Sequence, residues 1–221
     1  MSGMDAFQGF SPETVDFLWG IRLNNNRDWF LAHKAQYDQT LYQPMKALSQ
    51  VVFAAFQDVS NLACKLSRIY RDARLHPPTP YKESLWLSMR PDGLAWSEQP
   101  TLYFEIRPEA YSYGFVLWRP KTAALAKFRS LLDYRPEEFL DLVKKLEGET
   151  GLMLTGEQYQ RKRACPNAAV APYYNVRGLM MDCDRSPDEL LFSPALAGEV
   201  VKTLKALLPL YEYCLRFTSD V

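Results

Sequence analysis

The chain has 221 residues, of which 48% are hydrophobic and 14% aromatic, so it is long enough to bury a large core without disulfides or a structural metal. Its 26 Lys and Arg side chains are balanced by 26 Asp and Glu side chains, whereas proteins that bind phosphate backbones usually carry a basic excess. The balance argues against a general nucleic-acid-binding protein.

Cysteine and histidine usage argues against the common metal sites. The four cysteines are widely spaced and the chain has only two histidines, His33 and His76, whereas structural zinc sites use ligands paired a few residues apart. We therefore expect no metal and no disulfide, and a reducing compartment in which the cysteines are small buried residues. These cysteines are Cys64, Cys165, Cys183 and Cys214.

Targeting and membrane signals are also missing from the sequence. Residues 1–10 lack the basic start and apolar stretch of a signal peptide. The longest wholly apolar run, residues 51–56, is far shorter than the roughly 20 residues of a membrane-spanning helix. We expect a cytoplasmic protein without a membrane partner.

The first sixty residues carry helix signals. Residues 11–13 supply a capping hydroxyl, a proline at the first helical position and an acid that faces the helix dipole. Residues 24–26 are asparagines that interrupt this helix and can cap a second one, and Pro44 predicts the start of a further helix. The second helix should carry an apolar side made of Trp29, Phe30, His33 and Tyr37.

A two-residue alternation replaces the helical period near residue 65. Residues 66–71, 84–90, 101–107 and 111–118 are each predicted to be strands. In the third, we expect the even-numbered residues Leu102, Phe104 and Ile106 to face inward and Tyr103, Glu105 and Arg107 to face outward. The short connections favour antiparallel pairing.

Helical patterns return after residue 121. We expect helices at 123–132, after residues 135–137, and from 193 to about 207, with a restart at Pro209 and a short strand at 176–181. Helices followed by strands and then helices indicate an α+β fold. The prediction is one domain, residues 1–221, with a mainly antiparallel sheet at about 65–119 packed against N- and C-terminal helices.

Familiar catalytic and cofactor motifs do not occur. The sequence has no phosphate-binding G-x-x-x-x-G-K-[ST] loop, no G-x-G-x-x-G, no G-x-S-x-G and no H-E-x-x-H. A histidine-based triad would have to use His33, which lies on an apolar helical side, or His76. We expect no cofactor.

One segment, residues 67–83, gathers three arginines, two tyrosines, a lysine and two carboxylates. Arginine forks bind carboxylates and phosphates in a bidentate way, and prolines at 77, 78 and 80 restrict the loop. Two interpretations stand: a salt-bridged strand edge, or a site for a small anionic ligand. The ligand-binding candidates are Arg68, Arg71, Arg74, Tyr81, Lys82 and Arg107.

Short motifs extend this pattern along the chain: F-x-G-F at 7–10, N-N-R-D-W-F at 25–30, R-I-x-R-D-x-R at 68–74, P-Y-K at 80–82, Y-F-E-I-x-P at 103–108 and L-P-L-Y at 208–211. Together they resemble an uncharacterised bacterial and fungal family, a conserved domain of unknown function. The resemblance implies an α+β fold and no established activity. Many members carry an Asp in a longer loop before P-Y-K, where this chain has residues 75–79.

Three functional hypotheses follow. The first is a binder of a small anionic metabolite, or an enzyme acting on it, with Asp72 or Glu105 as the acid/base candidate. The second is a protein-interaction module that uses the same Arg- and Tyr-rich surface. The third, nucleic-acid contact through the basic run at 161–163, competes with an ordinary solvated turn. Arg27 is either structural or a further ligand contact.

Overall fold

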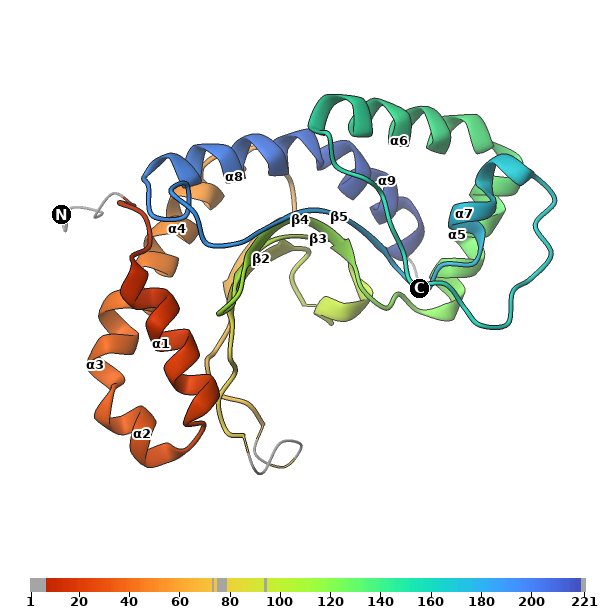
Figure 1. Ribbon diagram of the computed structural model, residues 1–221. Coiled ribbons are helices and arrows are strands. Elements are labelled where there is room, and N and C mark those ends of the chain that lie inside the picture. Colours follow the sequence, from red (N-terminus) through yellow and green to blue (C-terminus); the bar gives the residue numbers. More distant parts are fainter. Residues whose placement is uncertain (1–6, 73, 75–78, 94, 220–221) are drawn as a thin grey trace. The chain divides into compact units, whose positions relative to one another are not determined.

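The computed structural model describes residues 7–72, 74, 79–93 and 95–219 (Figure 1). Helices precede and follow the strands at 63–117, as the periodicity predicts, but a fifth strand at 179–185 lies outside the range of about 65–119 expected for the sheet. The helical elements are α1 (Pro12–Leu23), α2 (Arg27–Ala32), α3 (Lys34–Gln36), the π-helical turn η1 (Tyr37–Tyr42), α4 (Gln43–Ala54), η2 (Trp96–Glu98), α5 (Thr122–Tyr134), α6 (Pro136–Thr150), η3 (Ala168–Val170), α7 (Ala171–Tyr174), α8 (Ala195–Ala206) and α9 (Leu208–Thr218).

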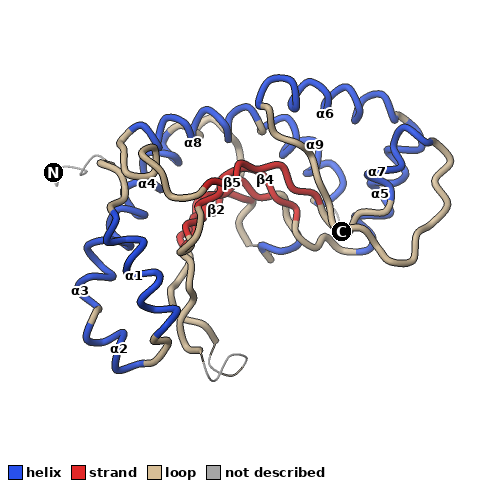
Figure 2. The backbone as a smooth tube through the Cα atoms, in the orientation of Figure 1, coloured by secondary structure: helices blue, strands red, loops and turns tan. Residues whose placement is uncertain are grey.

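A five-stranded antiparallel sheet accounts for the strands, which are red in Figure 2. Neighbouring strands along the chain are also neighbours in the sheet, in the order β1-β2-β3-β4-β5. The α+β prediction is therefore confirmed. The strands are β1 (Ala63–Leu66), β2 (Leu85–Arg90), β3 (Thr101–Ile106), β4 (Tyr111–Leu117) and β5 (Leu179–Arg185).

The strand predicted at 66–71 is wrong in its position, because β1 ends at Leu66. Beyond it, an isolated antiparallel bridge between Tyr70 and Tyr81 and a few single backbone hydrogen bonds continue the pairing. Pro80 accepts a hydrogen bond from the Arg71 N–H at 2.8 Å but has no N–H to return. The regular ladder cannot extend through this position.

Strand β3 follows its predicted alternation. Leu102, Phe104 and Ile106 are fully buried, and Tyr103, Glu105 and Arg107 are half-buried. The two sides of β3 therefore differ as the sequence predicts.

Polar capping explains the N-terminal helices. Thr14 and Ser11 form a reciprocal capping box at the start of α1, and the Asn26 side chain accepts a hydrogen bond from the Trp29 N–H at the start of α2. The buried Thr14 hydroxyl also donates to the Thr40 carbonyl at 2.5 Å. Pro44 has no N–H for that carbonyl, so the hydroxyl supplies the missing donor.

None of the described helices is long and apolar enough to cross a bilayer.

The chain groups into two compact units, neither of which is continuous in sequence. The first unit comprises residues 1–89, 104–113 and 184–202, and the second comprises 90–103, 114–183 and 203–221. The single domain expected from the sequence stays a prediction.

Aromatic rings fill the core of each unit. In the first, the Phe10 and Phe104 rings stack with centroids 5.8 Å apart. In the second, the Phe128 ring lies 5.0 Å from Phe217 and 5.2 Å from Phe139, which joins α5, α9 and α6.

Two glycines of the second unit provide a matched test of this packing. A Cβ on the buried Gly114 of β4 would lie 2.5 Å from the Asp182 Cα of β5, so Gly114→Ala should destabilise the fold by about 1–3 kcal/mol. Gly148 of α6 is exposed with no such neighbour, so Gly148→Ala should stabilise by about 0.5–1 kcal/mol. Urea unfolding of both variants measures the difference, and equal shifts would contradict the close β4–β5 approach.

Candidate functional site

Residues 67–71 lie beside residues 80–86, next to strand β1. The Ser67 N–H donates to the Trp86 carbonyl at 2.8 Å and the Lys82 N–H donates to the Ile69 carbonyl at 2.7 Å. These bonds hold the two arms of the segment side by side. Ile69 and Tyr81 point into the core and are 1% and 3% exposed.

A cavity of about 480 Å³ in the first unit is lined by both arms, by α1 and by β3. Four basic side chains face it against three acidic ones, and aromatic rings and a serine complete the wall. The basic residues are Arg22, Arg71, Lys82 and Arg107, the acidic ones Asp72, Glu83 and Glu105, and the others Tyr70, Ser84 and Trp86.

Lys82 is the cation of this cavity whose charge is least compensated. Its Nζ donates to the Arg68 carbonyl at 2.7 Å and lies 4.3 Å from the centre of the Trp86 ring. Within the described residues it forms no ion pair with a carboxylate. Burial, followed by the like charges of Arg71 and Arg68, lowers the pKa of the Lys82 ammonium.

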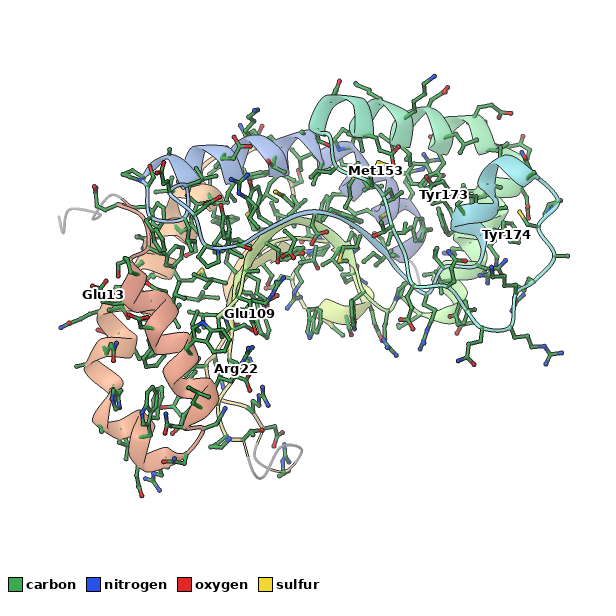
Figure 3. The ribbon with its side chains drawn as sticks, viewed as in Figure 1. Glu13, Arg22, Glu109, Met153, Tyr173 and Tyr174 are labelled. Carbon is green, nitrogen blue, oxygen red and sulfur yellow. The ribbon has the colours of Figure 1, made fainter. Side chains whose placement is uncertain are left out.

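Arg22, by contrast, is held by two carboxylates. Its Nε donates to Glu83 Oε2 at 2.6 Å, and its Nη1 donates to Glu109, which lies beside it in Figure 3. The hydrogen bond that Arg22 donates to Glu109 raises the pKa of the Arg22 guanidinium, and the same bond lowers the pKa of the Glu109 carboxyl. The charge of Arg22 is thus neutralised locally.

Arg71 lies farther from its carboxylate partner than Arg107 does. Arg71 Nη1 donates to the Thr79 hydroxyl at 2.9 Å, while its nearest carboxylate oxygen, on Glu83, is 3.8 Å away. Arg107 Nη2 donates to Asp184 at 2.5 Å, and its Nη1 donates to the Ser112 hydroxyl at 3.1 Å. Arg71 therefore keeps more of its charge available than Arg107 does.

Glu105 differs from the other two acids. Among the described residues it has neither a hydrogen bond nor an ion pair from its side chain. Asp72 instead accepts two hydrogen bonds from the Arg74 guanidinium, at 3.0 and 2.7 Å. Glu105 is the carboxylate of this cavity that is available to a ligand or a proton.

The structure brings together five of the eight residues singled out in the sequence: Arg71, Asp72, Lys82, Glu105 and Arg107 line the cavity. The remaining three are Arg68, Arg74 and Tyr81. Arg68 contributes its carbonyl and its charge to Lys82, and the Arg74 side chain is 89% exposed. Tyr81 stacks on Phe30 with ring centroids 4.2 Å apart.

Sequence reasoning missed Arg22, Ser84 and Trp86. Arg22 lies in the last turn of α1, far along the chain from the other lining residues, and no spacing rule links it to them. The sequence pattern marks Trp86 only as one residue of the alternating strand predicted at 84–90.

The cysteines are not all buried as expected: Cys214 is buried, but Cys64, Cys165 and Cys183 are half-buried. The described residues contain no group of three His, Cys, Asp or Glu that could hold a metal ion. His33 stacks on Trp29 with ring centroids 4.1 Å apart, whereas His76 and the prolines at 77 and 78 lie outside the described residues. All four cysteines are free, and burial raises the pKa of the Cys64 thiol to about 11.

Comparison with known protein families assigns the chain to one of them. The model of the conserved hypothetical protein family DUF2461 matches residues 13–213. The chain belongs to this family. The match covers every residue that lines the cavity described above. No curated protein matches the chain.

The Arg22–Glu83 ion pair can be measured by a double-mutant cycle. Both side chains are 29% exposed, so the coupling in Arg22→Gln and Glu83→Gln should be about 0.5–1 kcal/mol in urea unfolding. The exposed Lys145–Glu149 pair of α6 is 3.9 Å long and should show about 0.3 kcal/mol. A coupling no larger than this control would mean that Arg22 is not fixed by Glu83.

Proposed function

We propose that the cavity around Lys82 binds a small organic anion, as a binding site or as the active site of an enzyme that acts on an anionic metabolite. The supporting observation is the environment of Lys82. Its ammonium is partly desolvated, lies near Arg68 and Arg71, and has no carboxylate partner within the described residues. Crowded like charges repel unless a negative group offsets them, and a bound anion would supply that group.

Neighbouring groups suit the recognition of a carboxylate or phosphate. Arg71 is oriented by Thr79 but is only distantly paired with Glu83, so its fork can reach a ligand together with Lys82. The Trp86 ring lies beneath the lysine and offers an apolar face to the organic part of the molecule. Four basic side chains against three acidic ones leave the lining with a net positive charge, which favours an anion.

Glu105 gives the cavity a group for proton transfer. A carboxylate without a partner among the described residues can accept a proton from a ligand held on Lys82 and Arg71, provided that the proton lies within hydrogen-bond reach. Asp72 is less suited to this role because Arg74 occupies both of its oxygens. In an enzyme, Glu105 would be the general base and Lys82 the anion contact.

Thermal unfolding with citrate tests the binding proposal. Citrate should raise the unfolding temperature of the wild type, whereas Lys82→Gln should be at least as stable without citrate and should not respond to it. Removing the charge relieves repulsion from Arg68 and Arg71. Lys46→Gln, at an exposed site on α4, should respond like the wild type. A wild type indifferent to citrate, with a Lys82→Gln variant that melts far lower, would indicate a structural lysine.

The lowered pKa of Lys82 predicts a pH dependence. A bound anion favours the protonated amine, so sulfate affinity should fall as the pH rises toward a midpoint below the ordinary lysine pKa of 10.5. Sulfate keeps its own charge over this range. Calorimetric titrations at several pH values measure the effect, and a flat profile up to pH 10.5 would rule out Lys82 as the anion contact.

A protein-interaction role for the same surface is the second candidate. Tyr70 and Trp19 are 55% and 40% exposed, and exposed aromatic rings near arginines are typical of interface hot spots. Trp19→Ala distinguishes the two roles because Trp19 is not among the residues that line the cavity, so this variant should leave the citrate response of a small-molecule site intact. Loss of that response in Trp19→Ala would instead extend the ligand site to this ring.

A further inference from the structure

A second cavity, of about 460 Å³, lies within the second unit and is lined by four basic side chains. No Asp or Glu is among its lining residues in the described part of the chain, unlike the cavity around Lys82. The basic residues are Arg129 of α5 and Arg161, Lys162 and Arg163. The basic run at 161–163 therefore faces a fourth cation that is remote in the sequence.

The backbone of the basic run is fixed by Asn175. The Asn175 side chain accepts a hydrogen bond from the Arg163 N–H at 2.9 Å and donates to the Arg163 carbonyl at 3.1 Å. The Asn175 carbonyl also accepts from the Tyr159 N–H at 2.8 Å. Asn175 is 6% exposed, so this clamp is part of the packed structure. The run is held over the cavity, although its side chains are exposed.

Arg129 is the deepest of the four cations. It is 8% exposed and, within the described residues, makes no hydrogen bond or ion pair through its guanidinium. Asp133, one turn further along α5, accepts a hydrogen bond from the Tyr174 hydroxyl at 3.0 Å instead. Burying a cation without a paired acceptor is costly.

Electrostatics at Arg129 agree with this geometry. Burial, followed by the like charge of Arg163, lowers the pKa of the Arg129 guanidinium, and Tyr174, Tyr159 and Asp133 oppose the shift more weakly. The positive charge of Arg129 lowers the stability of the fold unless a negative group offsets it.

We propose that this cavity binds the phosphate group of a small phosphorylated organic molecule, with the Arg129 guanidinium as the deep contact and residues 161–163 neutralising the remaining charge. Guanidinium forks match phosphate oxygens in a bidentate way, and four cations without a lining acid suit a multiply charged anion. Leu125 and the Tyr159 ring, which also line the cavity, provide apolar surface for the organic part.

Burial of Arg129 favours a small molecule over a nucleic-acid backbone. A terminal phosphate can reach a guanidinium that is 8% exposed, whereas the phosphodiesters of a continuous strand follow an open basic groove. The chain as a whole also carries no basic excess.

Calorimetric titration with phenyl phosphate tests the proposal in full-length protein carrying Lys82→Gln, so that binding at the first cavity does not contribute. In this background, Arg129→Met should weaken phenyl phosphate binding roughly tenfold or more, the usual effect of losing a charge-assisted contact. Without the ligand, Arg129→Met should unfold at the same or a higher temperature, because a buried unpaired charge is removed.

Two lysine variants test the proposal even if Arg129→Met fails to fold. Lys162 lies in the exposed basic run, so Lys162→Gln should weaken phenyl phosphate binding. Lys144 is exposed on α6, so Lys144→Gln should leave that binding unchanged. Absence of phenyl phosphate binding, or equal binding by Arg129→Met and its parent, would overturn the proposal. So would tight binding of a single-stranded oligothymidylate that phenyl phosphate fails to displace, which would assign the surface to nucleic acid.

Discussion

Alternation of side chains along β3 is the constraint on which the first cavity depends. Successive residues of a strand point to opposite sides, and Leu102, Phe104 and Ile106 are fully buried. Glu105 and Arg107 must then point the other way, where they meet the charged side of the 67–83 segment. A shift of one residue in register would bury both charges and expose three apolar side chains. The hydrophobic core therefore fixes the position of the polar site.

Four cations that line the two cavities fall into two classes according to their partners. Arg22 and Arg107 each bond a carboxylate closely, and such pairs serve mainly to fix geometry. Lys82 and Arg129 are desolvated, lie near other cations, and have no carboxylate bonded to them among the described residues. A protein maintains such groups at a cost in stability. Perturbed groups of this kind in a cavity are candidates for function rather than for structural support.

Loop polar groups are satisfied by side chains from elsewhere in the same unit. The Thr40 carbonyl, which Pro44 leaves without its usual donor, is met by the Thr14 hydroxyl, and the backbone of Arg163 is met by the Asn175 amide. Both Thr14 and Asn175 are buried. Because an unpaired buried polar group costs about 1–3 kcal/mol, these side chains help to fix the π-helical turn η1 and the turn at Arg163. One of those turns presents the basic run at 161–163.

Local chemistry let the sequence alone determine the class of fold and most of its elements. The caps at Ser11 and Asn26 and the alternation in β3 act over a few residues, so they can be recognised without coordinates. The charged segment at 67–83 was recognisable for the same reason. Only the tertiary structure decided that Arg22 joins that segment, that β1 ends at Leu66, and that the run at 161–163 faces Arg129. Arg129 adjoins Phe128 on a helix whose apolar pattern gives no sign that a charge is buried beside it. Contacts between residues far apart in the chain arise from packing of whole elements, which no local spacing encodes.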